Sequence, residues 1–504
     1  MRLRFFRAAL LAGAALSTPL LAQRGAQDWT TAGYDAQRSN WLRGDGKITP
    51  ESVGKHAIEL LWKVKLNNAP RQTSALTPPA LLDFYIGYRG FRTLGFFGGS
   101  SDVVVGIDTD LARIEWEKKI GTPGAAGTVQ CPGGTTSAVA RITPLNFPAS
   151  GFGRGRGNPG KSGVGEPGEG AVTLKDVRPP QAAPPPPPPA AATKTGRRQP
   201  QASAASPYTP RAQYAYAVSG DGKLHLLYVS NGEEPNPAID FVPANSNAVG
   251  LMVFEGMAYV ATVNNCGGTP DGIWAVDLES KKVLQWKANG KIAGTQGFAV
   301  APDGTLFVAA GNELVALDSE TLQSKGSYKA GAAFTSSPLV LEWKGKSAVA
   351  ATTADGRLHV VDSGMAPLGS GDAGVGSYAV GALASYQETG STRWILAPSA
   401  TKIVALKMTD KGGAVAVEPG WTSRDMVSPI TPAVVNGVIF AVSAGKRGTP
   451  AVLYGLDAAG KEVWSSGKSI ASFVTTGGLA AGGGRIYVST HDGTQYAFGA
   501  PMEH

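Results

Sequence analysis

The sequence is poor in cysteine, histidine and charged residues, and each shortage removes a class of function. Its 504 residues include two cysteines and five histidines, and 17% of them are charged. No Cys-x-x-Cys-His motif is present, so there is no attachment site for a c-type haem. No histidine has a His or Cys partner at the spacing of zinc ligands, and the Gly-x-Ser-x-Gly and phosphate-loop motifs are missing. Zinc, haem, acyl-transfer and nucleotide chemistry therefore lack their usual motifs.

The two cysteines, Cys131 and Cys266, allow two interpretations. In an oxidising compartment they form one disulfide. In a reducing compartment they are two free thiols. Their spacing along the chain does not choose between these alternatives, because a disulfide depends on the distance and direction of the two side chains in space.

The N-terminus has the pattern of an export signal. Arg2, Arg4 and Arg7 precede an apolar stretch over residues 8–21, which is shorter than an ordinary membrane span, and a cleavage point follows Ala22. We therefore expect a signal peptide over residues 1–22 and a periplasmic or secreted protein, with an uncleaved anchor helix as the alternative. No later segment is long and apolar enough to span a membrane.

The formal net charge of +8 is concentrated in two segments. The signal peptide carries three arginines, and residues 150–211 contain nine basic and three acidic residues, which leaves the rest of the chain at −1. A basic patch on a folded surface would indicate a nucleic-acid partner, but these charges lie in tails. We therefore predict no nucleic-acid partner.

Most of the chain consists of a repeated unit of short β-rich runs separated by Gly and Asp turns. One strand of the unit ends in a Val/Ala/Leu-x-Asp pattern, and Asp-Gly turns precede four of its copies. Copies recur about every 40–50 residues, which is the spacing of β-propeller blades. The eight copies lie at residues 103–108, 223–229, 272–277, 313–318, 357–362, 402–407, 452–457 and 494–499.

A second set of eight segments aligns as the innermost strand of each blade. Pro79, Pro338 and Pro432 recur there, and proline favours an edge strand because it donates no ladder hydrogen bond. The last copy lacks a fourth strand, whereas residues 59–66, which include Trp62, form an extra one at the other end. We therefore predict an all-β, eight-bladed propeller of four-stranded antiparallel blades, with its ring closed by an N-terminal strand.

Trp116, Trp286 and Trp464 occupy the position of Trp62 in other copies, and we expect all four to pack between blades. His225 and His359 also share a repeat position, which indicates a structural role. Residues 148–210 interrupt the second blade with a Pro/Gly-rich sequence that has few large apolar residues. Such a sequence buries too little apolar surface to fold, and we expect a disordered insertion in a single propeller domain over residues 23–147 and 211–504.

The opening Asp28-Trp29…Gly33…Asp35…Arg38, together with the repeat seen in residues 273–277 and Trp286, resembles the quinoprotein (PQQ-dependent) alcohol dehydrogenase family and its PQQ-like repeats. The resemblance implies a propeller fold. It also implies either a PQQ- and Ca²⁺-dependent dehydrogenase acting on an alcohol or sugar, or a related propeller without quinone that serves as an assembly scaffold.

The active-site pattern of those dehydrogenases is incomplete here. They carry two adjacent cysteines over the quinone, and this chain has no Cys-Cys pair. Asn264 and Asn265 lack the neighbouring carboxylate expected of a Ca²⁺ loop, and Asp271 fits an Asp-Gly turn. We therefore assign no metal ligands, catalytic residues or cofactor, and favour a non-catalytic binding or scaffold module over a PQQ-dependent dehydrogenase.

The best candidate site is the mouth of the central funnel, where polar residues open the innermost strands. A ring of donors and acceptors there would suit a small molecule or a protein partner, although such residues also solvate a channel mouth. We expect the protein to act as a monomer. The predicted ring consists of Thr77, Thr136, Asn247, Gln296, Ser336, Tyr378, Thr431 and Thr476.

Overall fold

The computed structural model describes residues 28–55, 57–72, 75–87, 89–122, 127–147, 213–372, 374, 376–388, 392–475 and 479–501. The predicted signal peptide and insertion lie outside these residues, so both remain predictions. Within the described chain, no helix has the length and apolarity needed to cross a membrane.

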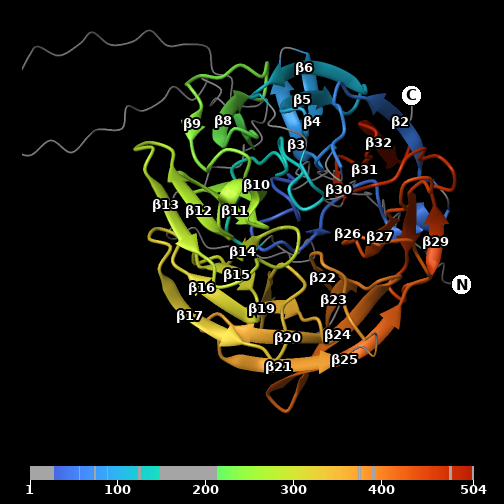
Figure 1. Ribbon diagram of the computed structural model, residues 1–504. Coiled ribbons are helices and arrows are strands. Elements are labelled where there is room, and N and C mark those ends of the chain that lie inside the picture. The colour runs from blue at the N-terminus through green and yellow to red at the C-terminus, as the bar shows by residue number, and fades with distance from the viewer. Residues whose placement is uncertain are drawn as a thin grey trace, which may run out of the picture.

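Eight β-sheets are arranged around a central axis as an eight-bladed propeller, which confirms the predicted fold (Figure 1). Each blade runs from an innermost strand near the axis to an outermost strand on the rim. Blades 1, 3, 4, 5 and 6 have four antiparallel strands in chain order. Their strands are β3 (Ala80–Gly87), β4 (Gly90–Gly99), β5 (Val103–Asp108) and β6 (Arg113–Lys119); β10 (Asn247–Phe254), β11 (Met257–Val263), β12 (Gly272–Asp277) and β13 (Val283–Lys287); β14 (Phe298–Val300), β15 (Leu306–Ala310), β16 (Glu313–Leu317) and β17 (Ser324–Lys329); β18 (Leu339–Trp343), β19 (Lys346–Thr352), β20 (Arg357–Asp362) and β21 (Pro367–Asp372); and β22 (Ala384–Gln387), β23 (Arg393–Pro398), β24 (Ile403–Lys411) and β25 (Ala414–Thr422).

Blades 2 and 7 depart from four strands. Blade 2 contains β7 (Tyr214–Val218), β8 (Lys223–Tyr228) and β9 (Ile239–Asp240), and its innermost strand is reduced to a single bridge between Ala140 and Tyr216. Blade 7 contains β26 (Ala433–Val435), β27 (Val438–Ser443), β28 (Val452–Leu456) and β29 (Glu462–Ser465), and β1 (Trp41–Leu42) adds a parallel strand inside β26.

The N-terminal strand β2 (Glu59–Lys65) closes the ring, as predicted. It pairs antiparallel with β32 (Thr494–Gly499), the last strand of blade 8, which also contains β30 (Ala480–Gly482) and β31 (Arg485–Ser489). Trp62 of β2 donates its indole N–H to the Thr109 carbonyl of blade 1 at 3.0 Å. The two ends of the described chain are therefore joined within one sheet. The pairing with β2 covers the edge of β32 that would otherwise be free.

The predicted tryptophans do lie at blade junctions. Trp464 of blade 7 donates to the Ile58 carbonyl just before β2 at 2.8 Å, and Trp116 of blade 1 donates to the Val229 carbonyl of blade 2 at 2.9 Å. Together with Trp62, they link blades 7, 8, 1 and 2 in succession. A buried indole needs such an acceptor, because leaving its N–H unpaired costs free energy.

Five of the eight repeat copies end in an aspartate that closes a turn. The Asp277 carboxylate accepts the backbone N–H groups of Glu279 and Ser280 at 2.9 and 2.7 Å. These hydrogen bonds lower the pKa of Asp277. Such Asx turns explain why the repeat requires Asp at this position. Asp108 and Asp318 likewise accept the N–H groups two and three residues ahead, whereas Asp362 and Asp457 accept those two and four residues ahead.

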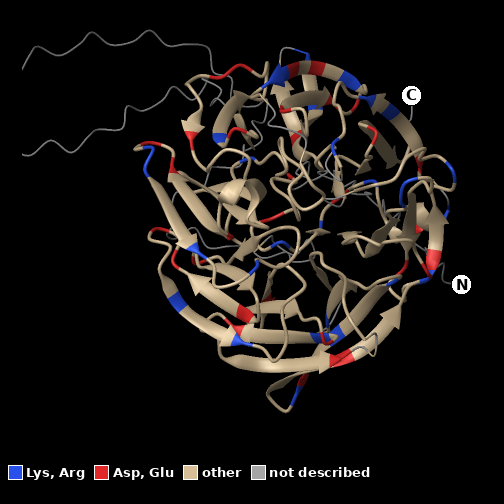
Figure 2. Cartoon of the chain, in the orientation of Figure 1, with Lys and Arg blue, Asp and Glu red and all other residues tan. Residues whose placement is uncertain are grey.

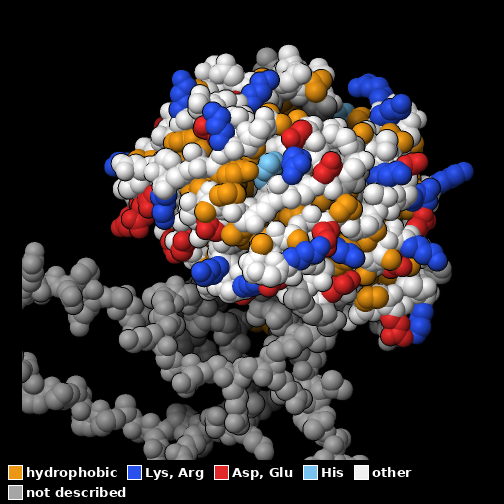
Figure 3. All heavy atoms as spheres, turned by 90° about the horizontal axis from the view of Figure 1, so that it is seen from below, with side chains coloured by type: hydrophobic (Ala, Val, Ile, Leu, Met, Phe, Trp, Pro, Cys, Tyr) orange, Lys and Arg blue, Asp and Glu red, His pale blue; other side chains and the backbone are white. Residues whose placement is uncertain are grey.

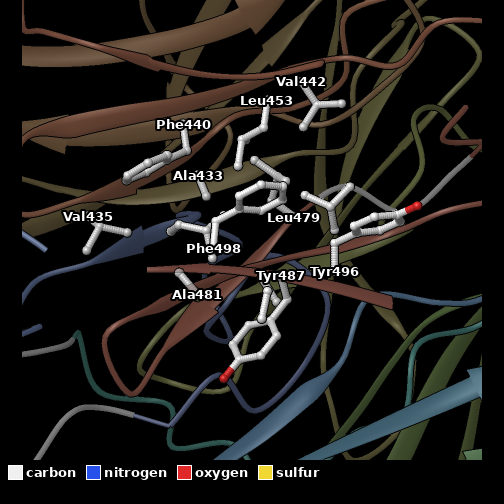
Figure 4. Packing of buried hydrophobic residues seen from close by; sticks show 14 of the residues in the cluster. Ala433, Val435, Phe440, Val442, Leu453, Leu479, Ala481, Tyr487, Tyr496 and Phe498 are labelled. Atoms are coloured by element: carbon white, nitrogen blue, oxygen red, sulfur yellow. The ribbon is translucent and has the colours of Figure 1, made fainter. Parts of the chain in front are cut away.

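Apolar side chains from adjacent blades interlock to form the core (Figure 4). At the junction of blades 7 and 8, Phe440 and Val442 of β27 lie against Tyr487 of β31 and Phe498 of β32, all of them buried. Helix α1 (Pro50–Gly54) adds Val53 to this cluster, and a Thr49–Ser52 capping box begins the helix. A short 3₁₀ turn, η1 (Cys266–Gly268), lies in blade 3.

Charged residues of both signs lie on the outer strands and the connecting loops (Figure 2). Seen from the side of β21 and β25, Lys and Arg are interspersed with Asp and Glu (Figure 3). β21 of blade 5 and β25 of blade 6 approach closely. A Cβ added to Gly371 of β21 would lie only 2.3 Å from the Val417 carbonyl oxygen of β25, so glycine is needed there. This contact shields part of the rim edge of blade 5.

Candidate functional site

Residues 28–45, here called the N-terminal strap, run around the axis along the inner strands. They bond to every blade in turn. Its residues 29–42 are buried for most of their length, in spite of their polar composition. Buried backbone groups need partners, and the innermost strands supply them. In the order of blades 1 to 8, the pairs are Trp29–Leu81, Thr30–Arg141, Thr31–Leu251, Ala36–Val300, Gln37–Val340, Ser39–Ser385, Asn40–Val434 and Asp45–Gly484.

Arg38 anchors the strap. Its guanidinium group is buried and donates to the carbonyls of Phe298 at 2.8 Å and Gly250 at 2.6 Å, to the Thr31 hydroxyl at 2.8 Å, and to the Ala32 carbonyl. Burial lowers the pKa of Arg38 to about 9, while nearby Asp35 opposes this shift. The guanidinium group thus satisfies acceptors from the strap and from blades 3 and 4 at once.

A small cavity lies between the strap and the inner segments of blades 1 to 4, and three residues of the predicted ring line it. Thr77, Thr136 and Gln296 meet there, with Ala32 of the strap among the other lining residues. The cavity has a volume of about 30 Å³. Sites for drug-sized ligands are roughly 300–1,000 Å³, so this cavity is suited to one or two water molecules. The buried Gln296 Oε1 has no hydrogen-bond partner in the described chain.

The remaining ring residues contribute mainly to blade structure. Thr431 accepts the Ala382 N–H and donates to the Ala382 carbonyl, both at 3.0 Å, which joins blades 7 and 6. Ser336 accepts the Thr352 N–H at 2.9 Å. Tyr378 is buried, and this burial raises the pKa of its hydroxyl. Thr476 lies outside the described residues.

Cys131 and Cys266 are disulfide-bonded, with their Cα atoms 5.4 Å apart. The bond joins the loop that enters blade 2 to η1 of blade 3. The Gln130 carbonyl next to it accepts the side-chain amides of Asn247 at 3.0 Å and Asn264 at 3.1 Å. Asn247, another residue of the predicted ring, therefore holds this loop in place.

Asp102, between β4 and β5, is a buried acid that the sequence pattern did not single out. One carboxylate oxygen accepts the Thr135 hydroxyl and the Gly220 N–H, each at 2.9 Å, and the other has no partner in the described chain. Burial raises its pKa, which Asp221 reinforces. Its φ of +57° places aspartate where blades 2, 5 and 8 have Gly222, Gly356 and Gly493 of an Asp-Gly turn, also at positive φ. In the sequence, the sign of this feature is the Ser101-Asp102 dipeptide, which precedes the first repeat copy where other copies have Asp-Gly.

A Ser–His–Glu chain in blade 2 has the composition of a catalytic triad but is a feature of the blade. Ser219 Oγ lies 2.9 Å from His225 Nε2, and His225 Nδ1 lies 3.3 Å from Glu234. Thr353 and His359 repeat the pair in blade 5 at 3.2 Å. Ser219 is buried and also bonds to the turn residue Asp221. This agrees with the structural role expected for both histidines.

The described residues offer little for a metal. They contain no group of three His, Cys, Asp or Glu side chains placed to bind one ion. Asp271 uses both oxygens in local structure, accepting the N–H groups of Asn265 and Ile292, each at 2.9 Å. The Ca²⁺ implied by the sequence resemblance therefore finds no convergent set of three such ligands among the described residues.

No protein-family model and no curated protein matches the chain. Among solved structures it is similar to quinohemoprotein alcohol dehydrogenase from Comamonas testosteroni, at 14% identity and a TM-score of 0.58, over 96% of this chain and 82% of that one. A europium-containing methanol dehydrogenase gives 10% identity and a TM-score of 0.56, over 95% and 99%. BamB from Moraxella catarrhalis gives 12% and 0.50, over 89% and 99%. The chain therefore shares the eight-bladed propeller fold of these proteins.

Proposed function

We propose that this chain is an exported, non-catalytic propeller that binds a partner. The observation that carries the proposal is the N-terminal strap. It bonds to all eight blades, and the cavity that it shares with blades 1 to 4 has a volume of about 30 Å³. A propeller whose inner strands are covered by such a strap can present its loops and rim to other molecules.

The use of polar side chains supports the same function. Thr431 and Ser336 bond to backbone groups of their own or the next blade, and Asn247 holds the disulfide-linked loop. An enzyme's funnel would direct several such groups toward a substrate. Export is part of the proposal, because the N-terminal sequence has a signal pattern and the disulfide suits an oxidising compartment. We expect a monomer, with cleavage before Gln23.

The alternative is a PQQ- and Ca²⁺-dependent dehydrogenase acting on an alcohol or sugar. It draws on the repeat and on the opening sequence around Trp29. It requires residues that hold the quinone and the metal, and the described residues contain no group of three His, Cys, Asp or Glu side chains placed to bind one ion.

Titration of the purified mature protein with PQQ and Ca²⁺ tests the proposal. A quinoprotein dehydrogenase serves as the positive control, and the chelator-treated protein serves as the negative control. We expect no saturable change in absorbance and an unchanged Tm, since a ligand that binds only the folded state raises Tm. Saturable binding with a raised Tm, followed by oxidation of an alcohol with an artificial electron acceptor, would replace the proposal with the dehydrogenase.

A further inference from the structure

Blade 1 carries an unusual group of exposed apolar side chains. Ile86 and Phe91, in the hairpin of β3 and β4, are 52% and 59% exposed, and Leu111, in the turn between β5 and β6, is 61% exposed. Ile114 on β6 is exposed as well. We call these four residues, with Phe84, the apolar tip. They lie where two neighbouring turns of one blade meet, because the Asp110 side chain accepts the Thr93 N–H at 2.8 Å.

The hairpin projects beyond the rest of its blade. The first pair between β4 and β5 is Leu94 with Asp108, so residues 90–93 of β4 extend past the third strand. Four residues of strand span about 13 Å. Ile86 and Phe91 are cross-strand partners and share one face, on which Phe84 stacks against Phe91 with ring centroids 4.6 Å apart. The projecting surface is therefore convex and apolar on one side.

The other side of the hairpin is cationic at its surface. Arg89, Arg92 and Arg113 converge on the Glu115 carboxylate at 3.2, 3.0 and 2.6 Å. Glu115 is only 10% exposed, whereas the side chains of Arg89 and Arg113 are 43% and 44% exposed. Asp108 is buried as well and lies 3.6 and 3.7 Å from Arg92 and Arg113. Both acids lie beneath the exposed guanidinium groups of Arg89 and Arg113, so solvent meets these guanidinium groups next to the apolar tip.

A projecting hairpin does not need apolar residues. The hairpin of β24 and β25 is of similar length, and its turn consists of Asp410, Lys411, Gly412 and Gly413. Such a turn can therefore be polar, and a contiguous group of exposed aromatic and aliphatic side chains marks an interaction site.

We propose that the apolar tip of blade 1 inserts into the interface of an anionic lipid membrane. Amphipathic elements with aromatic and aliphatic residues on one side and Arg on the other lie about 5–10 Å deep in this interface, within the reach of the hairpin. Exposed guanidinium groups then meet anionic headgroups. Because a convex surface also fits a protein groove, the guanidinium groups beside the tip, and not its shape, favour the anionic lipid surface. The proposal does not depend on the proposed function.

Vesicle flotation of the mature full-length protein tests this inference. The probe is vesicles of phosphatidylcholine and phosphatidylglycerol in equal amounts, compared with phosphatidylcholine alone. The test variant is Ile86→Ser with Phe91→Ser. The matched control is Val380→Ser, since Val380 is 69% exposed in the loop before blade 6. The basic residues of 150–211 are common to all variants, so any difference reports on the tip.

We expect the wild type and Val380→Ser to float with the mixed vesicles, and the double variant to bind about tenfold more weakly or less. Arg89→Gln should weaken binding to the mixed vesicles at about 0.1 M salt and have little effect at about 1 M. If the double variant melts early, Leu111→Ser in the other turn takes its place. A wild type that stays at the bottom of the gradient, or tip variants that float as it does, would overturn the proposal.

Discussion

Replacing Arg38 by methionine tests whether the N-terminal strap is anchored as described. Methionine fills similar space but donates no hydrogen bond, so the carbonyls of Phe298, Gly250 and Ala32 lose the guanidinium donor. Hydrogen bonds to a charged group contribute about 1.5–3 kcal/mol each. Removing a desolvated cation returns part of this loss, and we expect a net destabilisation of about 3–5 kcal/mol.

The entropy of unfolding is about 2.1 cal/mol/K per residue, so a chain of 504 residues gains roughly 1 kcal/mol/K. The expected fall in Tm is therefore about 3–5 °C, measured by calorimetry beside urea denaturation. Arg38→Lys keeps the charge but has at most three donors, and it should fall between the wild type and methionine. Arg357→Met, at an exposed arginine of β20, should change stability by less than about 0.5 kcal/mol. A loss below about 1 kcal/mol in Arg38→Met would refute the anchoring role.

Three further predictions concern the disulfide, a buried histidine and ring closure. Cys131→Ser with Cys266→Ser removes a link between residues 135 apart, and it should cost up to about 5 kcal/mol by the chain-entropy account; an unchanged Tm after reduction would contradict this. Burial lowers the pKa of His359 below 6.5, so its stabilising contribution is complete above about pH 6.5 and is lost as pH falls toward the folded value. His359→Gln should therefore flatten the fall in urea midpoint between about pH 7 and 5, and an unaltered slope would argue against it. Trp62→Phe removes the bond to Thr109 and should cost about 1 kcal/mol, with faster amide exchange in β2 and β32; exchange at wild-type rates would show that this bond does not secure the ring.

The propeller could be predicted because its repeat has a local cause. The predicted strand 272–277 coincides with β12, and 103–108 coincides with β5. In each, the final aspartate accepts N–H groups two and three residues ahead. The structural reason for the pattern therefore lies within a few residues of the sequence. Innermost strands such as β18 and β26 begin one residue after the recurrent prolines Pro338 and Pro432.

The strap could not be predicted because its partners are far away in the sequence. Arg38 bonds to Phe298 and Gly250, and nothing in residues 28–45 alternates or repeats. Their polar character is typical of an exposed segment. They can be buried because backbone groups of the inner strands satisfy their hydrogen bonds.

The positions of some ring residues could be predicted, whereas their role as a site stays a prediction. Thr77, Thr136 and Gln296 line one cavity, because the register of the innermost strands is set by the repeat. The orientation of Thr431 and Ser336 depends on the neighbouring blade, which a single copy of the repeat does not encode. The use of the funnel ring as a ligand site remains a proposal.

The strap visits the blades in their order around the ring, from Trp29 at blade 1 to Asp45 at blade 8. The length of the strap is therefore matched to a ring of eight blades. An open solenoid can gain or lose a repeat, because each repeat contacts only its neighbours. Here the loss of one blade would displace every later contact of the strap and separate β2 from β32. The first residues to be synthesised must also wait for the last blade, so the ring forms only after the whole chain is available.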